Sequence, residues 1–264
     1  VEARLLLPPG IEPHNFEPRP EDVIQLNKAD IFIYTNSYME PWADGLLKGI
    51  PNKGLEVVDA SAGVTFIRVA GPDEHAEHGT GGHDHHGEGM DPHVWLSIPN
   101  AEKMVDNITA ALAKKDPAGS ASYRRNAEAY RARLAGLDGR FKEGLAGCRH
   151  RLFLHGGHYA FGYLAHQYGL TYVSAYAVSA DAEPTPKKLI ELVNLMKQNS
   201  LTAIFYEELL SPRVAETIAR ETGATLLKLH GIHNVSREDL AGGATYISLM
   251  EQNLKNLRTG LQCR

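Results

Sequence analysis

The 264-residue sequence contains 13 histidines, and imidazole is the commonest protein ligand for zinc and related ions. Six of these histidines follow predicted strands or open a predicted helix: His14, His93, His155, His158, His230 and His233. Ligands of open parallel sheets bind beyond the carboxyl ends of the strands, so these imidazoles are expected to line the space between two facing sheets. One histidine in such a place is usually a hydrogen-bonded loop residue, but several from separate strands indicate a metal site.

The number of histidine ligands decides what chemistry such a site can do. Zinc takes four nitrogen, sulfur or oxygen ligands in a tetrahedron, and a catalytic site leaves one position for water. A site of four histidines has no such position, so it would bind metal without catalysing hydrolysis. A zinc-dependent hydrolase with three histidines and an open water position is the alternative, although the sequence contains no HExxH motif.

A second group of histidines lies in the stretch DEHAEHGTGGHDHHGEG: His75, His78, His83, His85 and His86. This stretch belongs to a predicted loop over residues 73–90 and has no apolar side chain that could anchor it to a core. We expect the loop to collect divalent metal weakly at several positions, and a solvated low-complexity loop is the alternative. A metal-storing or adhesive surface protein would use this loop as its functional part.

The second half of the sequence alternates strands and helices. Apolar runs rich in β-branched and aromatic residues predict strands at 151–155, 171–174, 202–206 and 225–229. Thr185-Pro186 and Ser211-Pro212 each place a hydroxyl before a proline, which is typical of a helix start. This alternation predicts a parallel sheet with helices on both faces.

The first half repeats the scheme less completely. Strands are predicted at 3–7, 30–34 and 55–58, with short helices that open at Pro20 and Pro41. This half therefore looks one strand-helix unit short.

Apolar residues recur every three or four positions from Tyr123 to Leu145, which predicts one long helix between the halves. We therefore predict an α/β protein of two lobes, each a small parallel sheet flanked by helices, joined by one long rigid helix. The predicted boundaries are 1–118 for the N-terminal lobe, 119–146 for the linking helix and 147–264 for the C-terminal lobe. A core helix of one larger domain is the alternative.

Composition excludes several classes of partner. With 27 Lys+Arg against 32 Asp+Glu, the chain lacks the basic surface that nucleic acid or an anionic membrane requires. No apolar run approaches the roughly 18 residues needed to span a bilayer, and no signal sequence opens the chain.

Five segments resemble, in order, the successive blocks of the zinc- and manganese-binding solute-binding proteins of bacterial ABC transporters. They are LLLPPGIEPHNFEPRPEDV, MDPHVWLSIPNAEKM, HYAFGYLAHQYGL, AEPTPKKLIELV and AIFYEELLSPRVAETIARETGA. The histidine-rich loop lies where the zinc-type members carry theirs, and the resemblance extends over essentially the whole chain. Members usually begin with a strand and a helix before the segment equivalent to ARLLLPPG, so the resemblance too implies a first lobe that lacks this unit.

The resemblance implies one metal ion held between the two lobes. The family's first three histidine ligands fall on His14, His93 and His158. The third position is typically a carboxylate in manganese-type members, so a histidine there favours Zn²⁺ over Mn²⁺. Glu207 matches an acidic residue that we expect to orient His158 by accepting a hydrogen bond rather than to bind the ion.

The fourth ligand departs from the family pattern. Many members have an aspartate after the last strand of the second lobe, whereas this sequence has LKLHGIHN there. His230 follows the predicted strand most closely and is the preferred fourth ligand, with His233 and then water as the alternatives.

The resemblance implies a high-affinity zinc-binding component of an ABC importer that delivers the ion to a membrane permease and is not an enzyme. Such a protein is expected to be a monomer that is periplasmic, or extracellular and lipid-anchored to the membrane surface. In an exported protein the two cysteines, Cys148 and Cys263, are expected to form one long-range disulfide, with two separate buried thiols as the alternative.

Overall fold

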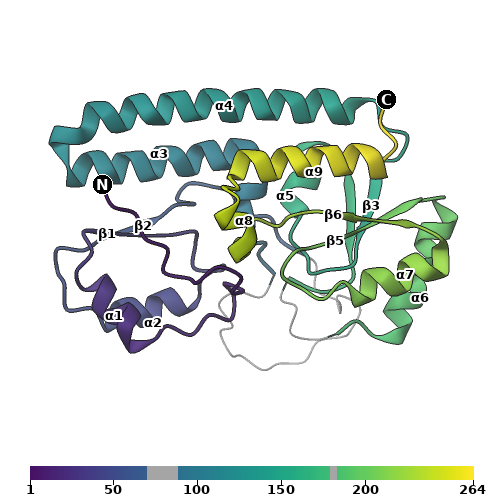
Figure 1. The fold of residues 1–264 in the computed structure, drawn as a ribbon, viewed down its shortest axis with the longest axis horizontal. Coiled ribbons are helices and arrows are strands. Elements are labelled where there is room, and N and C mark those ends of the chain that lie inside the picture. The colour runs from purple at the N-terminus through teal and green to yellow at the C-terminus, as the bar shows by residue number, and fades with distance from the viewer. Residues whose placement is uncertain (70–88, 179–182) are drawn as a thin grey trace.

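Two parallel sheets, one in each half of the chain, form the frame of the protein (Figure 1). The computed structural model describes residues 1–69, 89–178 and 183–264. The five histidines of the predicted loop lie outside the described residues.

The C-terminal half contains a four-stranded parallel sheet in the order β4-β3-β5-β6. Its strands are β3 (Leu152–His155), β4 (Thr171–Ser174), β5 (Ala203–Tyr206) and β6 (Thr225–Lys228). All four lie within the predicted ranges, so those strand predictions are confirmed. The chain adds β4 on one side of β3 and β5 on the other, which places a switch point of the topology between β3 and β5, where ligands of such sheets bind.

Helices cover both faces of this sheet: α5 (Gly162–Gln167), α6 (Pro186–Gln198), α7 (Arg213–Thr222) and α9 (Tyr246–Gly260). The short helix α8 (Arg237–Ala241), which has no buried residue, precedes α9. Thr185 caps α6 as predicted, because its side chain accepts a hydrogen bond from the Lys188 N–H. Ser211 does not cap α7, which begins at Arg213 after Pro212.

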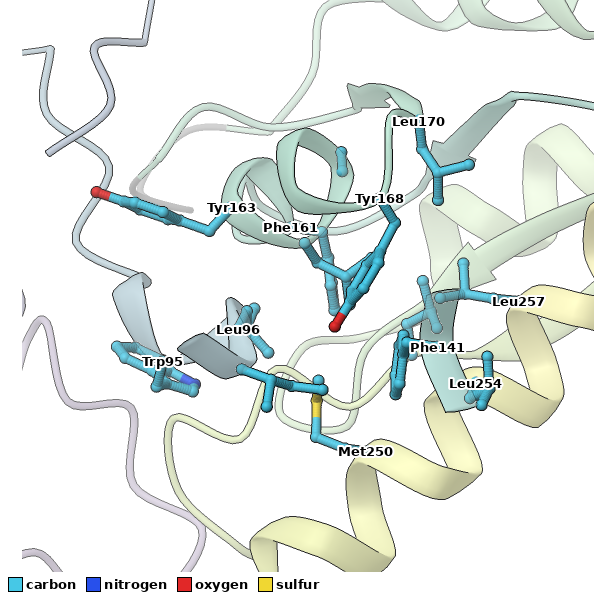
Figure 2. Close-up of a cluster of buried hydrophobic side chains, with 14 of the residues drawn as sticks. Trp95, Leu96, Phe141, Phe161, Tyr163, Tyr168, Leu170, Met250, Leu254 and Leu257 are labelled. Atoms are coloured by element: carbon cyan, nitrogen blue, oxygen red, sulfur yellow. The ribbon is translucent and has the colours of Figure 1, made fainter. Parts of the chain in front are cut away.

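Neighbouring residues of the central strands β3 and β5 pack into two different hydrophobic cores. Leu154 and Ile204 pack with side chains of α6 and α7. Phe153 and Phe205 belong to the larger core, which Figure 2 shows between the helices α5 and α9 and the short segment around Trp95. The alternation along each strand therefore explains why helices pack on both faces.

The sheet of the N-terminal half has two parallel strands, β1 (Ile31–Tyr34) and β2 (Glu56–Asp59). The helices α1 (Pro20–Leu26) and α2 (Trp42–Lys48) accompany it around a small core that includes Phe32 and Leu46. The strand predicted at 3–7 is wrong, since those residues have no regular structure and the Leu5 side chain is 65% exposed. Among the described residues no strand pairs with this segment, so its apolar run has no ladder to join.

A layer of long helices crosses both halves (Figure 1). After the 3-10 turn η1 (Val94–Leu96), α3 (Ile98–Lys115) leads through the turn η2 (Pro117–Gly119) into the 27-residue α4 (Ser120–Ala146). The predicted long helix is therefore confirmed. Its buried side chains all lie in its second half, where α4 packs against the core that α9 also contacts: Leu134, Leu137, Phe141 and Leu145.

A disulfide joins Cys148, just beyond α4, to Cys263, just beyond α9, across 115 positions of sequence. The predicted disulfide is therefore confirmed, and it fastens the C-terminal end of the chain to the end of the long helix. In the described part of the chain, none of the helices combines the length and apolar character that crossing a bilayer requires.

Candidate metal centre

Four histidine rings converge where the two halves of the chain meet. His14 follows Pro13 in a turn, and His93 immediately precedes η1. His158 follows β3, and His233 follows β6. Their Nε2 atoms form a series of short contacts, 3.4 Å from His14 to His93, 3.3 Å from His93 to His158 and 3.1 Å from His158 to His233.

Each of these three separations is close to that between two nitrogen ligands of one zinc ion. A tetrahedral site with Zn–N bonds of about 2.0–2.1 Å separates its ligand atoms by about 3.3–3.4 Å. Nitrogen lone pairs that face one another this closely repel unless a proton or a metal ion lies between them. Two sets of three side chains in the described residues are close enough to share an ion: His14 with His93 and His158, and His158 with Glu207 and His233.

A buried carboxylate orients His93. Asp91 Oδ1 lies 2.7 Å from His93 Nδ1 and also accepts the His93 backbone N–H at 3.0 Å. Neither side chain is exposed to solvent. A proton held on Nδ1 leaves Nε2 free to bind a metal ion. Burial, together with the neighbouring histidines, holds the pKa of His93 well below its ordinary value, and burial raises the pKa of Asp91 to about 7.

Glu207 holds His158 in the same way. Its Oε2 lies 2.6 Å from His158 Nδ1, and its Oε1 accepts the His158 backbone N–H at 2.7 Å. Gly157 makes this approach possible, because a Cβ atom there would lie 1.8 Å from Glu207 Oε1. Burial works against ionisation of both groups, but their mutual attraction outweighs it, raising the pKa of His158 and lowering that of Glu207.

The rings of His14 and His233 are half-buried. The turn that carries His14 is held by Trp42 Nε1, which donates to the Pro13 carbonyl at 2.9 Å, and by Glu12 Oε1, which accepts the His14 N–H at 3.2 Å. The His233 ring lies against Gly231, where a Cβ atom would be 2.0 Å from the ring carbon Cε1. Burial and the neighbouring His158 hold the pKa of His233 well below its ordinary value.

The structure does not bring His230, the preferred fourth ligand, to this cluster. Its Nδ1 accepts the Ile232 N–H at 2.9 Å, its Nε2 lies 3.9 Å from Asp239 Oδ2, and it belongs to neither set of three candidate ligands. The place beside His158 is taken by His233, the second choice from sequence. His155 also stays outside, buried against the rings of Phe161 and Tyr172.

Sequence reasoning missed Asp91, Glu12 and Glu208. Asp91 had a signal, since a carboxylate two residues before a histidine in DPH can reach the ring Nδ1 and the backbone N–H of that histidine together. Glu208 lies beside His230, and only the folded chain shows that contact.

Comparison with known families decides what kind of protein this is. The family described as zinc-uptake complex component A, periplasmic (ZnuA), matches residues 1–260. The chain belongs to the ZnuA family. The resemblance seen in the sequence is therefore confirmed, and so is the expected α/β fold.

Individual ZnuA relatives agree with this assignment. The high-affinity zinc uptake system protein ZnuA of Bacillus subtilis is 38% identical over 260 residues, which cover 98% of this chain and 81% of that protein. The zinc-binding lipoprotein AdcA of Streptococcus pneumoniae is 37% identical over 258 residues, covering 98% of this chain but 51% of AdcA. The chain thus spans about half the length of AdcA.

A solved ZnuA-like structure has the same fold. The crystal structure of the Zn(II)-bound ZnuA-like domain of Streptococcus pneumoniae AdcA superimposes with a TM-score of 0.79 at 34% sequence identity. The match covers 97% of this chain and 89% of that domain.

Proposed function

We propose that this ZnuA-family protein is the zinc-binding component of an ABC importer, which captures Zn²⁺ between its two halves and delivers it to a membrane permease. The observation that carries the proposal is a chain of three Nε2–Nε2 contacts of 3.1–3.4 Å that joins four imidazoles. His14 and His93 come from before the long helix α4, and His158 and His233 come from after it. Relatives named for zinc uptake and zinc binding support the same cargo.

The ligands that we propose are His14, His93, His158 and His233. Nitrogen donors suit zinc, whereas oxygen-rich sites suit manganese, so this set favours Zn²⁺ over Mn²⁺. The carboxylates of Asp91 and Glu207 act through the ring Nδ1 atoms, where they place negative charge near the dication.

Capture without catalysis follows from the same ligand count. Four imidazoles complete a tetrahedron, which leaves no position for the water that a hydrolase must activate. We therefore propose that the protein binds and releases zinc unchanged. A metal-storing or adhesive role would depend on the histidine-rich stretch, which lies outside the described residues.

The same proposal includes a place of action outside the cytoplasm, either periplasmic or lipid-anchored, for a protein that works as a monomer. The Cys148–Cys263 disulfide suits an oxidising compartment. The matching family is described as periplasmic, which supports the same location. We also propose that residues 1–118 and 147–264 act as two lobes and that 119–146 links them.

The test is a competition titration of chelator-stripped protein with zinc and with manganese. We expect one tight zinc equivalent that manganese does not displace, that is lost in His158→Ala and that persists when residues 75–86 are deleted. His166→Ala is the matched control, because His166 is an exposed histidine on α5. Weak binding at several positions that neither histidine substitution changes would overturn the proposal.

A further inference from the structure

The segment that carries His233 adopts an unfavourable backbone conformation. We call residues 230–234 the His233 loop, which follows β6. Ile232 has a φ of 57°, in the left-handed region that β-branched residues rarely adopt. Such a conformation persists only where surrounding contacts over-determine it. The contacts that hold this loop therefore decide where the His233 ring lies.

Side chains from outside the loop bind its first two residues. Asn253 of α9 accepts the His230 N–H through Oδ1 at 2.7 Å and donates to the His230 carbonyl through Nδ2 at 2.8 Å. Glu208, just beyond β5, accepts the Gly231 N–H at 3.1 Å. Trp95 of η1 donates to the Gly231 carbonyl at 2.9 Å. Three distant parts of the chain thus fix the backbone immediately before Ile232.

The His230 side chain holds Ile232 itself. Its Nδ1 accepts the Ile232 N–H at 2.9 Å, in a turn closed by the imidazole rather than by a backbone carbonyl. Glu208 holds the loop through the Gly231 N–H and not through this ring nitrogen, because the lone pair of Nδ1 already accepts the Ile232 N–H. The His230 and Glu208 side chains are only 5% and 2% exposed, so water does not readily replace either contact.

We propose that His230 is a positioning residue that does not bind the ion. With Glu208 and Asn253, it holds Ile232 in the left-handed turn that presents the His233 ring to His158. Gly231 completes this turn, because the His233 ring occupies the space that a Cβ atom there would need. This inference rests on the proposed zinc-binding function, and it assigns the two histidines of HGIHN to different tasks.

The proposal makes a specific demand on the side chain at position 230. Asparagine places its Oδ1 at the same number of bonds from the backbone as histidine Nδ1, so His230→Asn keeps an acceptor for the Ile232 N–H. Glutamine places its oxygen one bond farther out, and alanine has no acceptor. We therefore expect His230→Asn to retain zinc affinity better than His230→Gln or His230→Ala.

The experiment measures zinc affinity by chelator competition and the visible spectrum of Co²⁺ at saturation, on the full chain. Removing a group that orients a ligand typically costs about 10–100-fold in metal affinity. We expect a loss of that size in His230→Ala with an unchanged cobalt spectrum, and near wild-type affinity in His230→Asn. His233→Ala should change the spectrum, because it removes a ligand.

Two controls separate positioning from other roles. Ile232→Gly removes the unfavourable φ, so it should restore part of the affinity when added to His230→Ala. Circular dichroism checks that each variant is folded, and if His230→Ala is not, the comparison of His230→Gln with His230→Asn takes its place.

The possible failures are distinguishable. If the wild-type protein binds no tight zinc, the proposed function itself fails. If it binds zinc tightly but His230→Ala binds equally well, only the positioning role is overturned. A cobalt spectrum altered by His230→Ala and unaltered by His233→Ala would show instead that His230 is the ligand.

Discussion

Replacing Glu207 by glutamine tests how the zinc ligands are held. Glu207 contacts His158 twice, since its Oε1 accepts the backbone N–H and its Oε2 lies 2.6 Å from ring Nδ1. A glutamine has one acceptor oxygen and one donor group in this place, so it cannot satisfy both. If its amide donates to Nδ1, the ring proton moves to Nε2, the atom that we propose binds zinc.

The expected magnitude follows from that loss of the correct tautomer. Removing such a partner costs about 10–100-fold in metal affinity, which corresponds to about 1.4–2.7 kcal/mol. The assay is chelator competition at pH 7.5, with Glu191→Gln as the control, because Glu191 is an exposed residue on α6. Unchanged zinc affinity in Glu207→Gln, or an equal loss in Glu191→Gln, would refute the reasoning.

Three further predictions concern protons, the disulfide and shape. Burial opposes protonation of His158, but Glu207 raises its pKa, so protons compete with zinc already near neutral pH and affinity falls as pH drops. Titrations at pH 7.5 and 5.5 that give equal affinity would count against this. Replacing both Cys148 and Cys263 by serine lowers the free energy of unfolding by up to about 5 kcal/mol, from the entropy of closing a chain segment of 115 residues. Urea unfolding of the metal-free protein measures it, and an unchanged midpoint would argue against that stabilisation. Zinc leaves the small-angle scattering radius unchanged within error, because the α3–α4 hairpin packs along both halves; a large decrease would contradict this.

Local patterns in the sequence were enough to predict the C-terminal sheet. Its central strands, β3 and β5, are buried on both faces, so continuous apolar runs bounded by turn residues mark them clearly. The run at 3–7 is also apolar, although it has no β-branched or aromatic residue, and it is not a strand, since pairing depends on a neighbour that a sequence window does not contain. The long helix was predictable because its apolar stripe repeats over many turns.

The candidate site shows the same difference between ligands that local motifs predict and a ligand that depends on contacts between distant residues. His14, His93 and His158 stand in recognisable motifs, and the structure brings their rings together. The order of preference between His230 and His233 came from distance along the chain beyond the last strand. In the structure, the position of the His233 ring instead depends on the left-handed conformation of Ile232 and on Asn253 of α9, which binds the loop. Contacts so distant in sequence leave no local pattern.

One side chain connects the two parts of the chain that carry the most exposed ligands. Asn234, next to His233, donates to the carbonyls of Pro8 and Ile11 at 2.8 and 2.9 Å. Those carbonyls belong to the segment that leads to His14. The Asn234 side chain therefore ties the loop that carries His233 to the segment that leads to His14. A site arranged in this way orders few groups when zinc binds, and less of the interaction energy is then lost to conformational entropy.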